Sequence, residues 1–295
     1  MTKKLSIVIA AWNGTEALRR CLISLEKQVE AAEVEVIAVS NFPAQDLESN
    51  SHFSFVRFAF SAETTVPQLR SHGISLAHGE IIALAEDHCL FDKNWCRDIQ
   101  TAHASNHKAV GGAIENADGS RALDWAVFFY DYGKYMPPNR AGETETLSGF
   151  NASYKKEVLD ELREIYENGF FETFFNEELK KRGQKLYLTD SAIIYHAKNY
   201  ELKKTLIQFY HLARSFAAKR ISSTLFSRRA TFIAASLALP IVLPTRIALN
   251  IIKKNRRIKE LVCSFPFIIL LMSAWSWGEF RGYLGGEGAS AGEWK

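Results

Sequence analysis

The sequence predicts a doubly wound α/β domain with a mostly parallel central sheet, followed by a helical region that associates with a membrane. Two observations lead to this fold class. Apolar, β-branched runs alternate with helix-like segments from residue 5 to about residue 85, as expected of a parallel sheet covered by helices on both faces. From residue 201 the chain becomes rich in basic residues and long apolar stretches, which is typical of helices at a membrane surface.

The first half of the α/β domain shows strands and helices in turn. Residues 5–10 form a continuous apolar run that suits a buried strand, and Asn13-Gly14 marks the turn after it. Thr15 is a suitable N-cap for a helix that carries apolar residues at helical spacing as far as Leu25. The other expected elements are strands at 35–39, 53–60 and 80–85 and a helix at 66–78.

The second half of this domain is less regular. Residues 120–147 combine many aromatic residues with turn formers. Helices are expected at 155–167 and 172–182, and a strand within 186–195. We therefore expect three parts: an α/β domain over residues 1–200, a basic amphipathic helix and linker over 201–229, and a membrane-associated helical region over 230–295.

Composition narrows the class of protein. The chain has 295 residues, of which 47% are hydrophobic and 23% charged, so it is globular and not disordered. A net charge of +3 is too small to argue for nucleic acid. The four cysteines form no CxxC pair, so we expect reduced thiols in the cytosol. Because Asn13-Gly14 interrupts the N-terminal apolar run, a buried strand explains that run better than a secretory signal.

Polar residues follow the expected strands, at the edge where doubly wound sheets bind their ligands. A cluster of oxygen and nitrogen ligands after the fourth strand could hold a divalent cation against a diphosphate. Such a cation would neutralise the charge that develops on a leaving nucleoside diphosphate. A solvated polar loop is the alternative interpretation. The residues at the three strand ends are Trp12-Asn13, Ser40-Asn41 and Glu86-Asp87-His88.

An ordered set of motifs over roughly the first 200 residues resembles the family 2 glycosyltransferases. Each motif is weak alone, but their order and spacing are fairly specific. The resemblance implies a GT-A fold, which is Rossmann-like and binds nucleotides, and the transfer of a sugar from a nucleoside diphosphate sugar. The motifs are SIVIAAWNG, LRRCLISL, EVEVIAVS, LRSHGISLAHGEIIALAEDH, Trp95, VGG at 110–112, GFNASY at 149–154, FFETFFNEELKKRG at 170–183 and AIIYH at 192–196.

The resemblance implies roles for individual residues. Glu172 takes the place of the general base that deprotonates the acceptor hydroxyl, although a helix N-terminus also favours an acid for structural reasons. Trp12 stands where the family has an aromatic residue near the nucleotide base, and Arg70 matches an arginine near the diphosphate. The other expected residues are Ala10, Asn13, Asn41, Glu86 and Asp87 at the nucleotide sugar, Asp87, His88 and His196 at the metal, and Asn151 and Tyr154 on the acceptor side.

Two departures from the family's pattern affect the nucleotide and the metal. Ser40-Asn41 replaces the usual pair of aspartates after the second strand, so the nucleotide stays open, with a UDP-sugar favoured over a GDP-sugar. His88 replaces the last aspartate of the Asp-x-Asp motif, and imidazole suits manganese better than magnesium. We therefore expect a divalent cation, Mn²⁺ or Mg²⁺. Binding through Asp87 and water, or catalysis with little help from metal, are the open alternatives.

The expected function is that of an inverting glycosyltransferase that acts on a lipid or lipid-linked glycan acceptor. A catalytically silent membrane subunit is the main alternative, motivated by the altered motifs. A nucleotidyltransferase ranks lower, because no glycine-rich, lysine-bearing loop follows the first strand. We expect no nucleic acid partner, and the sequence leaves open whether the chain forms a homo-oligomer.

The pattern of apolar and basic residues in the C-terminal region predicts attachment to the cytoplasmic face of the cell membrane. Apolar stretches at 230–252 and 261–277 are each broken by proline and are marginal against the ~20 residues that a spanning helix needs. The loop at 253–259 carries five basic residues, which favours the cytoplasmic side. In-plane or re-entrant helices are therefore expected, with a two-span hairpin or a soluble oligomerisation surface as alternatives.

Overall fold

The chain forms two compact units in the computed structural model, which describes residues 4–29, 33–62, 65–105, 107–117, 119–221 and 226–292. Unit 1 comprises Met1–Ala117 and Tyr135–Ala197, and unit 2 comprises Asp118–Lys134 and Lys198–Lys295. The expected boundary at residue 200 is close to the end of unit 1. The segment Asp118–Lys134, expected inside the α/β domain, belongs instead to the helical unit. Residues 222–225 of the expected linker lie outside the described residues.

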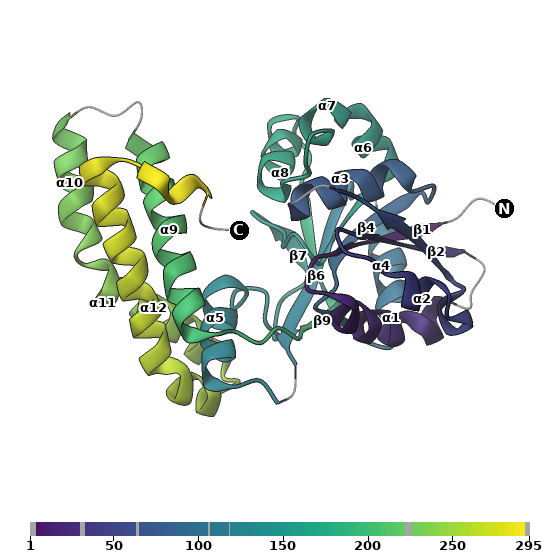
Figure 1. The fold of residues 1–295 in the computed structure, drawn as a ribbon, viewed down its shortest axis with the longest axis horizontal. Helices are drawn as coiled ribbons and strands as arrows, with labels where there is room; N and C mark the ends of the chain where they lie inside the picture. Colours follow the sequence, from purple (N-terminus) through teal and green to yellow (C-terminus); the bar gives the residue numbers. More distant parts are fainter. Residues whose placement is uncertain are drawn as a thin grey trace. The chain divides into compact units, whose positions relative to one another are not determined.

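A sheet in the order β3-β2-β1-β4-β8-β6-β9-β5 forms the centre of unit 1, with β7 paired to β9 (Figure 1). The first four strands are parallel to one another. Beyond β4 the sheet is mixed, because β8 runs antiparallel to both of its neighbours and β9 is parallel to β6. The strands are β1 (Leu5–Ala11), β2 (Val34–Ser40), β3 (Val56–Phe60), β4 (Ile81–Glu86), β5 (Cys89–Phe91), β6 (Ala109–Asn116), β7 (Gly142–Thr144), β8 (Ala152–Lys155) and β9 (Leu186–His196).

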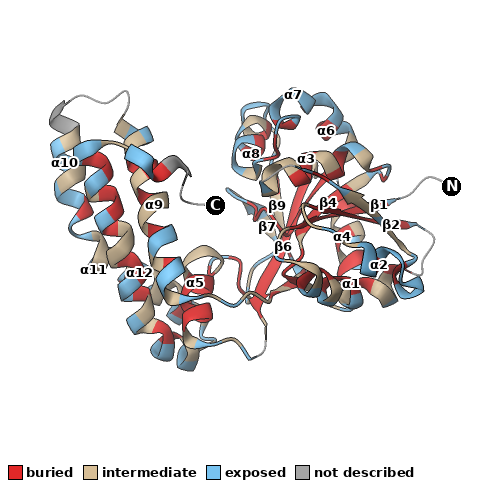
Figure 2. Cartoon of the chain, in the orientation of Figure 1, coloured by how far each residue is buried: buried red, intermediate tan, exposed pale blue. Residues whose placement is uncertain are grey.

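Helices cover both faces of this sheet, which explains the continuous apolar runs of its strands. All seven residues of β1 are buried, and red marks the buried residues of the central strands in Figure 2. Helix α3 lies so close to β1 that a Cβ on Gly73 would come within 2.2 Å of the Val8 side chain. The helices of unit 1 are α1 (Thr15–Val29), α2 (Gln45–Glu48), α3 (Val66–Leu76), α4 (Trp95–His103), α6 (Lys156–Glu161), α7 (Arg163–Tyr166) and α8 (Glu172–Lys181), with a 3-10 turn η1 (Ser51–Phe53).

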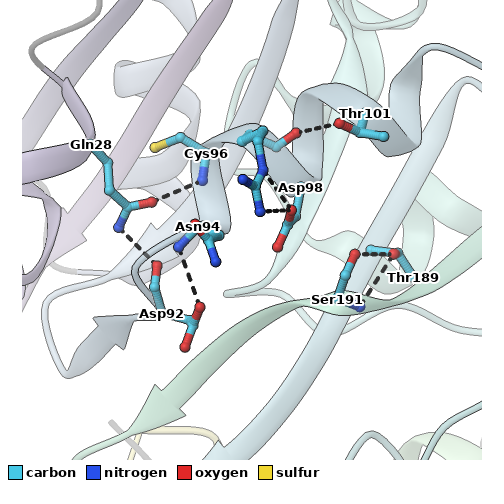
Figure 3. A network of polar contacts seen from close by, with 9 residues as sticks. Gln28, Asp92, Asn94, Cys96, Asp98, Thr101, Thr189 and Ser191 are labelled. Atoms are coloured by element: carbon cyan, nitrogen blue, oxygen red, sulfur yellow. Dashed lines mark hydrogen bonds and ion pairs between the residues drawn. The ribbon is translucent and has the colours of Figure 1, made fainter.

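The side chain of Gln28 joins α1 to the start of α4 (Figure 3). Its Nε2 donates to the carbonyl of Asp92 at 2.9 Å, and its Oε1 accepts from the backbone N–H of Cys96 at 3.1 Å. The N–H groups in the first turn of a helix have no partner within that helix. Gln28 therefore supplies one such partner from a distant element.

Unit 2 is a helical unit that includes an unexpected helix, α5 (Ala122–Asp131). This helix lies within residues 120–147, where the sequence suggested irregular structure. The carboxylate of Asp124 anchors its start by accepting from the backbone N–H groups of Arg121 and Tyr200. The other helices are α9 (Leu202–Ile221), α10 (Phe226–Ser236), α11 (Leu239–Lys254) and α12 (Ile258–Gly285), with a 3-10 turn η2 (Gly288–Gly292).

Helices α9 and α12 pack backbone to backbone. A Cβ on Gly278 would lie 2.3 Å from the carbonyl oxygen of Tyr210 and 2.8 Å from Ala213. One turn later, Gly282 meets Ala217 in the same way. Small residues four positions apart on both helices permit this close approach, an arrangement that is common between helices in membranes.

One helix of the described residues, α12 at Ile258–Gly285, is long and apolar enough to cross a membrane. A second candidate consists of Arg229–Ser236 and Leu239–Lys254, which are bent by 66° at a short break. The sharp bend suits the proline-broken stretch that the sequence predicted. Both candidates are identified by their length and composition.

Candidate active site

The carboxyl ends of β1, β2 and β4 meet at one edge of the sheet in unit 1. The register pairs Ala11 with Ser40 and Ala10 with Glu86, so the residues that follow these strands are neighbours. Ligands of doubly wound sheets bind at such an edge. The expected nucleotide-sugar residues Ala10, Trp12, Asn13 and Asn41 lie here, Ala10 fully buried and the other three partly or fully exposed.

Asp87 holds the loop between β1 and α1. Its Oδ2 accepts from the backbone N–H groups of Trp12 at 2.8 Å and Asn13 at 2.6 Å, and its Oδ1 accepts from Nδ2 of Asn13 at 2.6 Å. Burial raises the pKa of the Asp87 carboxyl, and these three hydrogen bonds act in the opposite direction. Both carboxylate oxygens face protein donors, so in this structure Asp87 shapes the loop and does not face an open metal position.

Arg70 links two carboxylates that lie far apart in the sequence. Its Nη2 lies 2.6 Å from Oε1 of Glu86 at the end of β4, and its Nη1 lies 3.0 Å from Oε2 of Glu172 at the start of α8. The Arg70 side chain is 7% exposed, whereas that of Glu172 is 30% exposed. The Glu172 carboxylate is therefore the member of this pair that solvent or an acceptor can reach.

Gly149 makes room for the pair, and the sequence did not single it out. A Cβ at this position would lie 2.8 Å from both Nη1 of Arg70 and Oε2 of Glu172. Side chains larger than hydrogen would therefore push the guanidinium and the carboxylate apart. The GFNASY motif contains this glycine, so the motif was the available signal.

The two carboxylates determine the charge state of Arg70. Burial by itself lowers the pKa of a guanidinium, but Glu86 and Glu172 outweigh this effect and raise the pKa of Arg70 above its ordinary value. Arg70 is therefore a permanent buried cation. An anion such as a diphosphate that approached this edge would compete with the two carboxylates for its five N–H donors.

The two expected histidine ligands are in contact with each other. His88 and His196 are both buried, with ring centroids 4.8 Å apart, and Phe150 packs against His88 at 5.2 Å. Nδ1 of His88 lies 3.5 Å from Oε2 of Glu86. These contacts bring two imidazoles and one carboxylate together at the carboxyl ends of β4 and β9.

The donor set does not form a metal centre by itself. No group of three or more His, Cys, Asp or Glu side chains placed to hold a metal ion occurs within the described ranges. Asp87, expected as a third ligand beside His88 and His196, is directed to the β1–α1 loop. The residues present therefore do not fit the predicted three-ligand site.

The two expected acceptor residues are structural. Asn151 is fully buried, where its Oδ1 accepts from the indole N–H of Trp95 and its Nδ2 donates to the carbonyls of Ala113 and Ala192. Tyr154 is also fully buried, and its hydroxyl donates to Oδ1 of Asn176 at 3.0 Å. Neither side chain offers surface to an acceptor, so the expected acceptor role does not hold for them in this structure.

The motifs of the sequence did not indicate two buried polar side chains near the histidine pair and Gly149. Asn116 lies opposite His196 in the register of β6 and β9, and Ser148 directly precedes Gly149. Neither side chain has a hydrogen-bond partner in the part of the chain that the structure describes. Leaving such a group unsatisfied costs ~1–3 kcal/mol. They are therefore candidates for direct contact with a bound ligand or with water.

Comparisons with known proteins concern the family and the fold of the chain. Residues 6–163 match the model of the family described as Glycosyl transferase family 2. The structure resembles a TarS 1-349 crystal structure from S. aureus in complex with UDP-GlcNAc, at 14% identity and a TM-score of 0.52, over 92% of this chain and 91% of that one. It also resembles the mannosyltransferase PcManGT from Pyrobaculum calidifontis in complex with GDP-Man and Mn²⁺, at 12% identity and a TM-score of 0.56, over 96% and 88%. At these identities the likeness shows the fold alone. No curated protein sequence matches the chain.

Proposed function

The chain belongs to glycosyl transferase family 2, and from this premise we propose that it is an inverting hexosyltransferase that uses a nucleoside diphosphate sugar, with UDP-sugar favoured. The proposed acceptor is a hydroxyl group of a lipid or lipid-linked glycan at the cytoplasmic face of the cell membrane. The single observation that carries the proposal is the pairing of buried Arg70 with both Glu86 and Glu172 at the strand-end edge. This pairing places a cation that can bind a diphosphate, Arg70, beside a partly exposed carboxylate that can accept a proton, Glu172.

In the proposed reaction the donor's diphosphate takes hydrogen bonds from Arg70, which weakens the ion pair with Glu172. The released carboxylate of Glu172 accepts the proton of the acceptor hydroxyl. The hydroxyl oxygen forms a bond to the anomeric carbon while the bond from that carbon to the diphosphate oxygen breaks. The electron pair of that bond leaves with the nucleoside diphosphate, whose charge Arg70 stabilises. One displacement of this kind inverts the anomeric configuration.

The proposal includes a divalent cation at the donor's diphosphate. A structure of the same fold is in complex with Mn²⁺, which supports testing Mn²⁺ first and Mg²⁺ second. Asp87, His88 and His196 do not supply a three-ligand site here. The steps above therefore depend on Arg70 and Glu172 alone.

Membrane attachment is supported by the surface of unit 2. The large apolar side chains of α12 that remain exposed recur at helical spacing along one face: Ile258, Val262, Ile269, Leu270, Trp277 and Leu284. Exposed apolar patches of this kind mark interaction sites on soluble proteins or contact with lipid. The basic residues between α11 and α12 support the cytoplasmic side, as the positive-inside rule predicts.

Calorimetric titration of the detergent-purified protein with UDP and then GDP, each with and without Mn²⁺, tests the donor part of the proposal. We expect micromolar binding of one nucleotide, and a substantial loss of affinity in Arg70→Lys, because lysine cannot replace the planar fork. Arg97→Lys is the matched control, since Arg97 is exposed and, among the described residues, forms an ion pair only with Asp98. Absence of binding under every condition would favour the catalytically silent subunit.

A further inference from the structure

A groove of about 850 Å³ lies within unit 2, between the end of α5 and one face of α11. Val242, Arg246, Leu249 and Lys253 contribute to its wall from α11. These positions follow the i, i+4, i+7, i+11 pattern and so share one side of the helix. The facing wall comes from the end of α5 and the turn after it, including Phe129 and Lys134.

The groove combines cations with apolar surface. Lys134, Arg246 and Lys253 supply three positive charges, and Asp131 supplies the one acidic side chain among the lining residues. Neither Arg246 nor Lys253 forms an ion pair with another described residue, and both are exposed. Burial raises the pKa of Asp131 to about 7, so its opposing charge is incomplete near neutral pH. The net potential of the groove therefore favours an anion.

The charges lie toward one end of the groove. Lys253 is in the last turn of α11, where the helix dipole favours positive charge. Arg246 is seven residues earlier, about 10 Å along the axis, and both side chains are long enough to converge on one phosphate. Ile241 and Val242, 74% and 52% exposed, lie at the opposite end of the same helix. The groove thus has an anion-attracting end and an apolar end.

A second observation distinguishes this groove from the hollow of unit 1. The hollow between α3 and α7 in unit 1 is lined mainly by polar side chains such as Gln68, His72 and Arg163, and it lacks an exposed apolar wall. The groove of unit 2 is continuous with a helix pair that is apolar enough to reach a membrane. An occupant with one anionic group and a hydrocarbon chain matches both ends.

We propose that this groove is a binding site for an anionic membrane phospholipid, whose phosphate contacts Arg246, Lys253 and Lys134 and whose acyl chain lies along Ile241 and Val242. The site rests on the proposed membrane association of unit 2 but is independent of sugar transfer. Its ligand is a lipid of the bilayer and not the sugar acceptor. The bound phosphate would hold α11 against the end of α5, because it would contact Arg246 and Lys253 on one side and Lys134 on the other.

The test is a calorimetric titration of the full chain, in neutral detergent, with monomeric dioctanoyl phosphatidylglycerol. We expect saturable binding at one site per chain. The double variant Arg246→Gln/Lys253→Gln should bind at least about tenfold more weakly, because it removes both charge-assisted hydrogen bonds from α11 to the phosphate. Both side chains are exposed and unpaired with described residues, so an unchanged melting temperature confirms that the variant folds.

Matched controls separate the groove from the general basic surface of unit 2. Lys203→Gln/Lys259→Gln removes the same charge from exposed residues outside the groove and should change affinity less than twofold. Equal weakening by both double variants would overturn the proposal in favour of nonspecific attraction. Equal binding of dioctanoyl phosphatidylcholine, or of inorganic phosphate alone, would overturn it in favour of a purely apolar or a free-phosphate site.

Two further measurements distinguish failure of this site from failure of the proposed function. Flotation with phosphatidylcholine vesicles reports membrane association without anionic lipid, and titration with UDP or GDP reports the donor site. Retention of both activities together with no saturable binding of phosphatidylglycerol would contradict only the lipid site. Loss of flotation alone would contradict the membrane part of the proposed function.

Discussion

The proton acceptor proposed for the reaction is held by the group proposed to bind the diphosphate. Glu172 pairs with Arg70, and Gly149 leaves only enough space for that pair. Arrival of a diphosphate would therefore change the partner of Glu172 at the moment when the base is needed. In the proposed reaction, the Arg70 guanidinium therefore connects donor binding to deprotonation of the acceptor.

Glu172→Gln should abolish sugar transfer and leave nucleotide binding nearly intact. The amide keeps the size of the side chain but cannot take up the proton, and general base catalysis contributes ~10²–10⁴-fold to rate. Single-turnover transfer from a UDP-sugar to an extracted lipid fraction measures the first effect, and calorimetry measures the second. Glu178→Gln is the control, since Glu178 lies on the same helix and, within the described part of the chain, pairs only with exposed Lys181 and Arg182. Full activity in Glu172→Gln would exclude the assigned base.

Buried His103 should make the free energy of unfolding depend on pH. Its Nε2 lies 2.8 Å from Oγ of Ser153, which itself donates to the carbonyl of Val110, so the ring must donate as the neutral Nε2–H form. Burial lowers the pKa of His103 from 6.5 to about 4.

Because the folded state prefers the neutral ring, this stability is complete above pH 6.5 and is lost as the pH falls from 6.5 toward 4. The loss can reach roughly 3 kcal/mol. Urea unfolding at pH 7.5, 6, 5 and 4.5 measures it, and His103→Gln should flatten the slope over that interval. An identical slope in the variant would assign the effect to other groups.

The sequence predicted the positions of site residues correctly where the charge of the side chain determines its role. Arg70, Glu86 and Glu172 are charged residues in recognisable motifs, and the structure brings all three together. Asn151 and Tyr154 lie in an equally recognisable motif, but burial decides their role, and burial depends on distant elements such as α4 and α8. The same holds for Asp87, whose partners Trp12 and Asn13 follow the neighbouring strand β1 and lie far away in the sequence.

At the scale of secondary structure, close contact between α9 and α12 depends on glycine. Gly278→Leu should destabilise unit 2, because its Cβ would lie 2.3 Å from the carbonyl oxygen of Tyr210 and the helices would have to separate. Overpacking costs ~1–3 kcal/mol, so the melting temperature should fall by several degrees. Differential scanning calorimetry in detergent measures it.

Gly285→Leu is the matched control for this prediction. Gly285 lies at the end of the same helix, is exposed, and has no atom within 4 Å of a Cβ built on it. Leucine has a higher helix propensity than glycine, so this variant should melt at the same or a higher temperature. Equal destabilisation by both substitutions would show that the contact between α9 and α12 is not the cause.

Elements with a strong periodic pattern were predictable, and short or tertiary-dependent elements were not. The apolar runs gave β1, β2 and β4, and helical spacing gave α1, α3, α8 and α9. The strands β5 and β7 have three residues each, which is too few for a period. Helix α5 escaped notice because seven of its ten residues are buried, so it shows no polar face to define an amphipathic pattern.

At the scale of the whole chain, the helical unit is discontinuous in sequence. Helix α5 is inserted between β6 and β7 but packs with α11 and α12. The guanidinium of Arg257 at the start of α12 lies 5.2 Å from the ring centroid of Trp125 in α5. Composition along the chain does not reveal that a segment between two strands of one unit belongs to another unit. The predicted division into consecutive parts therefore placed residues 118–134 in the first domain.

A chain truncated after residue 197 should aggregate, because the apolar surface of α5 would lose its cover. Replacing residues 118–134 by a short Gly-Ser linker in the same truncated chain should restore a monomer. The ends are close enough for this, since the backbone N–H of Ile114 donates to the carbonyl of Tyr135 at 3.1 Å. Size-exclusion chromatography compares the two proteins, and equal aggregation of both would show that unit 1 needs more than the removal of α5.

The insertion of α5 also has a consequence for the order of synthesis. The last residue of α5, Asp131, leaves the ribosome 127 residues before the first residue of α12, Ile258. At 5–20 residues per second, the nascent chain carries this apolar helix without its partner for roughly 6–25 s. A bilayer surface or a chaperone close to the exit tunnel could cover α5 during that time, so translation near the membrane would favour correct assembly.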